Sequence, residues 1–223
     1  MKALRNHSLS LFFGLIFLAA LVGQAFAGHA EYNARQVAEG LATLSLGEYV
    51  TSSDFAVDVT ENWQSEYLQF LLYVLATVWL VQKGSPESKE LDKAGTESDE
   101  EQKIGRHATP ESPAWARYGD WRTTLYSRSL GMAMGLIFLG SWLAQSIAGR
   151  SAYNNEQLGQ LQDPVTWTAY LASADFWSRS LQNWQSEFLA VGSMAVLSIY
   201  LRQRGSPESK PVGSSHDATG QTG

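Results

Sequence analysis

The residues best suited to chemistry in this sequence belong to a motif, NWQSE, that occurs twice. It covers Asn62–Glu66 and Asn183–Glu187, and each copy is followed by an aromatic residue and a leucine. Acidic residues inside membrane segments mark proton or cation pathways, so Glu66 and Glu187 are candidates for such a site. The other candidate residues of the motif are Asn62, Trp63, Gln64, Ser65, Asn183, Trp184, Gln185 and Ser186.

Two glutamines offer a partner for each glutamate. Gln24 and Gln145 lie near the ends of apolar stretches, at depths that would match Glu66 and Glu187 in antiparallel helical hairpins. A Gln amide that donates to a Glu carboxyl would join the two helices of a hairpin. Two interpretations stay open: an outer-leaflet transport cluster of all four residues, or a structural lock within each hairpin. The shallow depth favours the lock, because transport sites lie near the bilayer midplane.

Composition excludes several kinds of site. The chain has 223 residues and no cysteine, which excludes disulfides, thiolate zinc sites and cysteine nucleophiles. Its four histidines are scattered, and no nucleophile or base accompanies the paired glutamates. We therefore expect no enzymatic activity, no metal and no cofactor. A net charge of -6 argues against nucleic acid as a partner.

The motif is part of a longer internal repeat. GSPESK occurs at Gly84–Lys89 and Gly205–Lys210, and GLIFL occurs at Gly14–Leu18 and Gly135–Leu139. All of these pairs share one offset of 121 residues, which indicates two tandem copies of one unit. The identity of GSPESK exceeds what helix termination needs. It indicates either a shared cytoplasmic turn or a motif that docks a partner.

Four apolar stretches approach the length of about 20 residues that a membrane-spanning helix needs. They cover about 9–27, 63–81, 130–148 and 184–201. Basic residues gather before the first, between the second and third, and after the fourth, so we expect both termini to be cytoplasmic. The predicted fold is an all-α membrane protein: four transmembrane helices form two tandem parallel-repeat helical hairpins with long outer helical extensions. The lipid bilayer is the expected partner. The sequence allows a homo-oligomer and leaves any ligand unknown.

The first apolar stretch also has the form of a cleavable signal, with a basic start, an apolar core and Ala25-Phe26-Ala27. Its twin at 130–148 lies in the middle of the chain and cannot be an N-terminal signal. This favours a retained first span. The alternative, cleavage after Ala27, would leave three spans.

The predicted organisation has five segments and several helix boundaries. The segments are a first hairpin repeat at 1–89, a disordered cytoplasmic linker at 90–113, an interfacial aromatic and basic segment at 114–128, a second hairpin repeat at 129–210 and a disordered tail at 211–223. Ser45–Glu48 is typical of a capping box, and Asp163-Pro164 of a helix start. Helices that begin near Ser53 and Ser173 are expected to run to Lys83 and Arg204, with Gly84 and Gly205 ending them.

Several stretches together resemble a family of bacterial membrane proteins that is known only as a domain of unknown function. They are AGHAEYN, NWQSEYLQ, NWQSEFLA and LRQRGSPESK, and the resemblance covers nearly the whole chain except the linker and tail. It implies an integral inner-membrane protein and brings no activity or ligand. We therefore expect a structural or regulatory protein. The alternative is a small transporter or channel that uses the outer Glu/Gln cluster.

Overall fold

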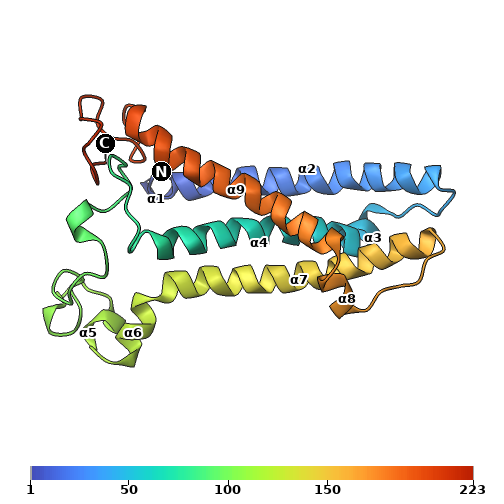
Figure 1. Cartoon of the computed structure of the whole chain (residues 1–223), viewed down its shortest axis with the longest axis horizontal. Coiled ribbons are helices and arrows are strands. Elements are labelled where there is room, and N and C mark those ends of the chain that lie inside the picture. The colour runs from blue at the N-terminus through green and yellow to red at the C-terminus, as the bar shows by residue number, and fades with distance from the viewer. Residues whose placement is uncertain (1, 223) are drawn as a thin grey trace. The chain divides into compact units, whose positions relative to one another are not determined.

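The regular structure of this protein is entirely helical. A computed structural model describes residues 2–222, and within them nine α-helices and two short 3-10 helices occur without a strand (Figure 1). This confirms the predicted all-α class. The elements are α1 (Lys2–Asn6), α2 (Ser8–Ala38), α3 (Leu46–Val50), α4 (Ser53–Ala76), η1 (Leu91–Lys93), η2 (Gly105–His107), α5 (Ala114–Arg117), α6 (Trp121–Ser127), α7 (Ser129–Gly159), α8 (Trp167–Leu171) and α9 (Ala174–Tyr200).

The chain forms two compact units. The first comprises Met1–Thr60 and Ala144–Ala172, and the second comprises Glu61–Leu143 and Ser173–Gly223. The first therefore holds α2, α3 and α8 with the beginning of α4 and the end of α7. The second holds the rest of α4 and α7 together with α5, α6 and α9.

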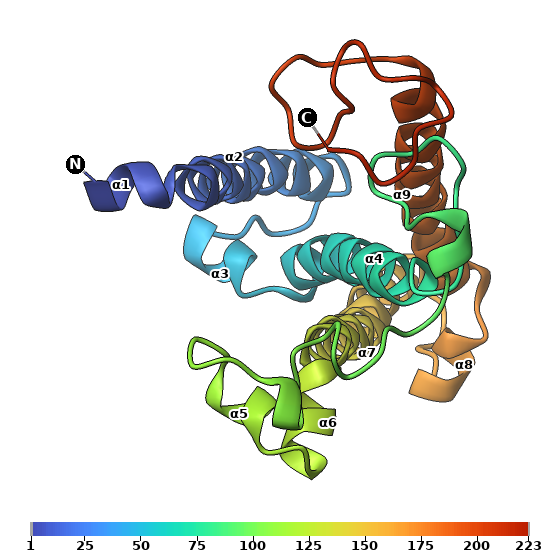
Figure 2. The same cartoon turned by 90° about the vertical axis from the view of Figure 1, so that its left-hand side faces the viewer.

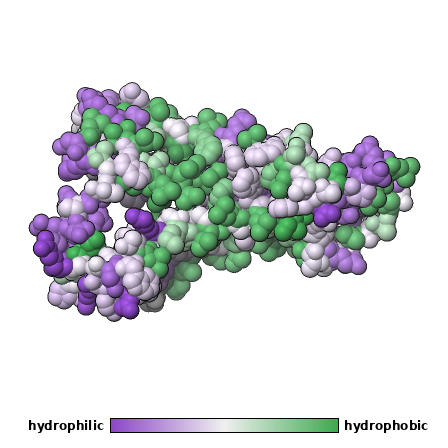
Figure 3. Space-filling view, turned by 60° about the horizontal axis from the view of Figure 1, so that its bottom comes forward, coloured by the Kyte–Doolittle hydropathy of each residue, from purple (hydrophilic) through white to green (hydrophobic). Residues whose placement is uncertain are grey.

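Two of the described helices, α2 and α7, are long and apolar enough to cross a membrane, with 31 residues each. No described side chain of α2 is buried, and Leu9 and Leu15 are 71% and 67% exposed. Hydrophobic residues cover much of the face that Figure 3 shows. Apolar helix surface of this extent is unstable in water and stable in lipid.

The same hydrogen bonds close two turns in the first unit, one between α2 and α3 and the other between α7 and α8. The amide of Asn33 accepts from the backbone N–H of Leu44 and donates to its carbonyl, both at 2.9 Å. Asn154 makes both bonds to Val165, at 2.8 and 3.1 Å. Because these residues lie at matched positions of the repeat, the matched sequence has produced the same local structure twice.

A buried tyrosine completes each of these turns. Tyr49 of α3 and Tyr170 of α8 are both buried, and their hydroxyl groups lie against Gly28 and Gly149. A Cβ atom at either glycine would collide with the tyrosine hydroxyl. Glycine is therefore required at both positions by the close approach of a ring.

One of the two predicted helix starts in these turns is correct. Ser45 forms the expected capping box, since its hydroxyl accepts from the N–H of Glu48 and the Glu48 side chain accepts from the N–H of Ser45. The start at Asp163 is wrong, because α8 begins at Trp167 with Thr166 as its N-cap. The physical reason is Asn154, which holds Val165 in the turn and so delays the helix.

Helices α4 and α9 begin where the sequence predicts but end earlier. They end at Ala76 and Tyr200, not at Lys83 and Arg204. In α9 the guanidinium of Arg202 donates to the carbonyls of Ser198, Ile199 and Leu201, which satisfies the free carbonyls of the last turn. Gly84 and Gly205 do have positive φ, at 88° and 80°, but they belong to the turns that follow.

The segments predicted to be disordered have a described conformation. The linker at 90–113 contains η1 and η2. In the tail, three backbone carbonyls accept hydrogen bonds from Lys210 Nζ, those of Ser215, His216 and Ala218. The disorder itself stays a prediction.

The contact between Gly149 and Tyr170 gives a stability prediction. We expect Gly149→Ala to lower the free energy of unfolding by about 1–3 kcal/mol, the usual range for an overpacked site. Gly140→Ala is the control, because no atom lies within 4 Å of a Cβ added there. Thermal unfolding in detergent measures both. Adding Tyr170→Phe to Gly149→Ala should recover much of the loss, and no recovery would show that the hydroxyl is not the cause.

Candidate functional site

The two NWQSE copies meet in the second unit. The indole Nε1 of Trp184 donates a 2.8 Å hydrogen bond to Oε1 of Gln64. Gln64 and Ser65 are buried, whereas the matched Gln185 and Ser186 are exposed. The copies are therefore alike in sequence but not in environment, because the first copy faces α9 while the matched residues of the second face outward.

An aromatic cluster surrounds this contact. The ring of Trp142 lies 5.6 Å from Phe138, 5.9 Å from Phe176 and 5.9 Å from Trp184, measured between centroids. Such ring pairs stabilise beyond their buried area. The sequence analysis missed this cluster, since the matched residue of the first copy is Leu21 and no repeat signal marks Trp142.

An ion pair joins α4 to α9 near the aromatic cluster. Arg179 Nη1 lies 3.3 Å from Glu61 Oε2, and Arg179 Nε lies 3.4 Å from Asp175. Together with Ser178, Gln182 and Asn183 these residues line a cavity of about 330 Å³. The pair adds a second polar link between the two helices.

The predicted Glu/Gln cluster is distributed over both units. Glu66 and Glu187 belong to the second unit. Gln24 and Gln145 belong to the first. The proposed pairing of each glutamine with a glutamate stays a prediction. Gln145 is fully buried, and neither its amide nitrogen nor its amide oxygen has a hydrogen-bond partner among the described residues.

The two GSPESK copies fold into the same turn. Ser88 Oγ accepts from the N–H of Gln82, and Ser209 Oγ accepts from the N–H of Gln203, both at 2.9 Å. Ser85 Oγ caps the N–H of Glu87, as the matched Ser206 does for Glu208. The serines of the motif are thus explained by the turn.

The glutamates of the two motif copies come together, although they are far apart in the sequence. The hydroxyl of Tyr73, in α4, donates to Glu87. A hydrogen bond from Glu208 to Glu87, together with the negative charge of Glu87, raises the pKa of Glu208 above its ordinary value. A proton held between the two carboxyl groups would let both turns approach, because two neighbouring ionised carboxylates repel.

A cavity of about 360 Å³ lies next to this carboxyl pair. It is lined by residues of α4, α9 and both turns: Gln69, Phe70, Tyr73, Glu87, Ala190, Val191, Met194 and Glu208. Tyr73 and Met194 occupy matched positions of the repeat, yet only Tyr73 carries a hydroxyl that reaches Glu87. The only sequence signal for this site was that both copies of GSPESK contain the same glutamate.

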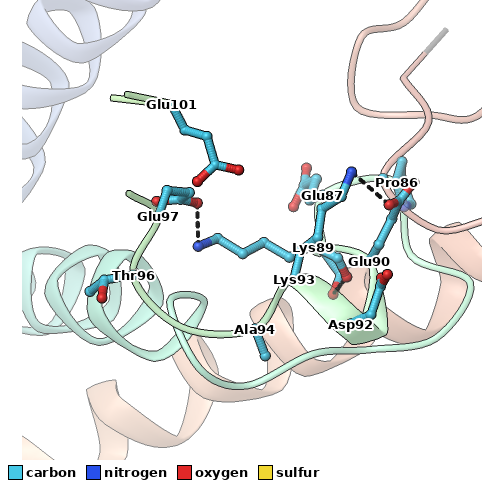
Figure 4. A pocket seen from close by; sticks show the side chains of 12 residues that line it. Pro86, Glu87, Lys89, Glu90, Asp92, Lys93, Ala94, Thr96, Glu97 and Glu101 are labelled. Carbon is cyan, nitrogen blue, oxygen red and sulfur yellow. Dashed lines mark hydrogen bonds and ion pairs between the residues drawn. The ribbon is translucent and has the colours of Figure 1, made fainter. Parts of the chain in front are cut away.

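A larger cavity of about 560 Å³ follows the first GSPESK turn (Figure 4). Lys89 reaches across it to pair with Glu97 and to donate to the carbonyl of Gly95. Lys93 pairs with Glu90 at 2.8 Å on another side. Both lysines of this cavity therefore already pair with acidic residues of the same chain. No group of three or more His, Asp or Glu side chains among the described residues could hold a metal ion.

The raised pKa of Glu208 predicts a pH dependence of stability. The native state holds this proton more tightly than the unfolded chain, so its stabilisation is complete below the ordinary Glu pKa of about 4.3 and is lost as pH rises through the folded-state value. We expect unfolding midpoints of the wild type to fall relative to Glu208→Gln over this range. The exposed Glu111→Gln is the control and should follow the wild type. Parallel curves for the wild type and Glu208→Gln would contradict a shared proton.

Nearly the whole chain matches a known family. A family model described as Domain of unknown function (DUF6766) matches residues 1–221. The comparison with curated proteins and the comparison with solved structures each found no match. The family match confirms the expectation that the chain belongs to a family known only as a domain of unknown function. Because it covers nearly every residue, the chain belongs to the family described as Domain of unknown function (DUF6766).

Proposed function

We propose that this chain is a multi-pass membrane protein with a structural or regulatory role and no catalytic activity. The observation that carries this proposal is the uncovered apolar surface of α2, which has no buried residue among those described. The apolar character of α7 supports a second span. A helix satisfies its own backbone hydrogen bonds, so lipid can take the place of a protein core around it.

We extend the proposal to four spans, arranged as two parallel hairpin repeats. Beyond the NWQSE motif, α4 exposes Phe70, Leu72 and Leu75, and α9 exposes Leu189 and Leu197. The repeat supports the same course for both copies, since the turns at Asn33 and Asn154 use the same hydrogen bonds. The lysines and arginines of the termini and of the segment between the second and third spans support a cytoplasmic location for these parts, in an inner membrane.

Because the sequence contains no cysteine, a single introduced cysteine is the only thiol that can be labelled, and its labelling reports the topology. Single-cysteine variants Thr43→Cys, Gln160→Cys and Ser98→Cys, each at an exposed position, are labelled with a membrane-impermeant maleimide. We expect label at Ser98→Cys only in inverted vesicles, and at the other two only in right-side-out vesicles. Labelling of Ser98→Cys and Thr43→Cys from one side would contradict the first hairpin.

Retention of the first span is checked on the same protein. The intact mass of the purified chain should remain at 24.6 kDa, the value for all 223 residues. A mass that lacks residues 1–27 would contradict retention while leaving the topology of the other spans unchanged.

A transport role is the second candidate, and one observation favours it. Gln145 is buried, and neither of its amide atoms has a hydrogen-bond partner among the described residues, which is costly unless a water or an ion completes the site. Glu66 and Glu187 are the charged groups of the predicted cluster, and such acids within a span mark ion pathways.

Ion flux in proteoliposomes separates the two roles. The structural role predicts no flux above that of empty vesicles. The transport role predicts a flux that Glu66→Gln combined with Glu187→Gln abolishes, whereas the exposed Glu39→Gln leaves it unchanged. A flux equal in the double variant and the wild type would reject this cluster as the pathway.

A further inference from the structure

A compact aromatic turn precedes the second candidate span. Residues 114–128 fold into α5 and α6, and α7 begins directly after them at Ser129 (Figure 2). The buried hydroxyl of Thr123 closes the turn. It accepts a 2.8 Å hydrogen bond from the N–H of Gly119 and donates one of 2.7 Å to the carbonyl of Trp115.

This aromatic turn leaves its rings at the surface. Trp121 is 63% exposed and Tyr118 is 54% exposed, and Trp115 and Tyr126 are exposed as well. Large rings are mostly buried in soluble domains. Trp and Tyr gather instead at the headgroup level of a membrane, because one side of each ring is apolar and its polar group can remain hydrated.

Arg122 is held among these exposed rings. Its guanidinium carbon lies 4.7 Å from the centroid of the Tyr118 ring and 5.7 Å from that of Trp121. A guanidinium stacked on rings keeps its N–H donors at its edge, where they fit the oxygens of a phosphate.

The remaining charges of the turn are either fixed or positive. Asp120 is occupied as the N-cap of α6, where its carboxylate accepts from the N–H of Arg122 at 2.9 Å. Arg117 donates to the carbonyls of Ser112 and Pro110, which fixes its position. With Arg128 at the end of α6, three arginines stand against one aspartate. The surface therefore complements a negative charge.

We propose that residues 114–128 bind the anionic phospholipids of the membrane surface, with Arg122 as the residue that contacts the lipid phosphate. A bilayer is the occupant that fits, because the turn joins a helix that could itself cross a membrane, and its rings require an apolar–polar boundary. This inference rests on the proposed membrane insertion and adds to it a lipid class and a residue.

The test uses the full chain in vesicles. The exposed Thr124→Cys carries a bimane fluorophore, and the vesicles are an equal mixture of phosphatidylcholine and phosphatidylglycerol. A nitroxide label is placed on one lipid or the other, so that quenching reports which lipid is adjacent. We expect stronger quenching by phosphatidylglycerol. Arg122→Gln should reduce this preference about fivefold, because one arginine near an anionic surface contributes about that factor.

A matched control variant and three contradicting outcomes complete the design. Arg106→Gln removes an exposed arginine outside the turn and should leave the preference intact. Equal quenching by both lipids in the wild type would overturn the lipid proposal alone. Equal preference in the wild type and Arg122→Gln would overturn the role of Arg122. A chain that does not float with the vesicles and is quenched by neither lipid would overturn membrane insertion itself.

Discussion

Apolar helix surface without a protein cover is the constraint on which the rest of this structure depends. The side chains of α2 between Leu9 and Phe26 are almost all aliphatic or aromatic, and none of them is buried. A bilayer removes this surface from water and tolerates only backbone that bonds within itself. Long uninterrupted helices follow from that demand. Turns that need side-chain support, such as those closed by Asn33 and Asn154, lie beyond the apolar stretches.

Polar contacts then hold the helices of the second unit together. The Trp184–Gln64 hydrogen bond and the Arg179–Glu61 ion pair join α4 to α9. Tyr73, near the end of α4, donates to Glu87 of the first GSPESK turn, and Glu87 interacts with Glu208 of the second turn. In the proposed four-span arrangement, lipid would supply no hydrophobic force that presses one apolar helix onto another, so polar contacts would carry much of the specificity. Both repeated motifs therefore provide contacts that join α4 to α9.

Local signals in the sequence predicted local structure well. The capping box at Ser45 and the N-cap at Ser173 follow from residues within one turn. Gly84 and Gly205 do not end α4 and α9, as the sequence predicted, but lie in the turns that follow. What the sequence did not reveal depends on contacts across longer distances. The late start of α8 follows from Asn154, and the carboxyl pair from two turns far apart in the chain. Helical periodicity contains none of this information.

The central claim is that α4 and α9 lie in lipid although their first halves are polar. Leu72 and Leu197 are the positions to measure, because both are exposed apolar residues beyond the NWQSE motif. Nitroxide labels at Leu72→Cys and Leu197→Cys in vesicles report access to oxygen, which concentrates in lipid, and to a water-soluble nickel chelate. The account predicts high oxygen and low nickel access at both positions, as at Leu15→Cys in α2. High nickel access at Leu72→Cys or Leu197→Cys would contradict the four-span arrangement.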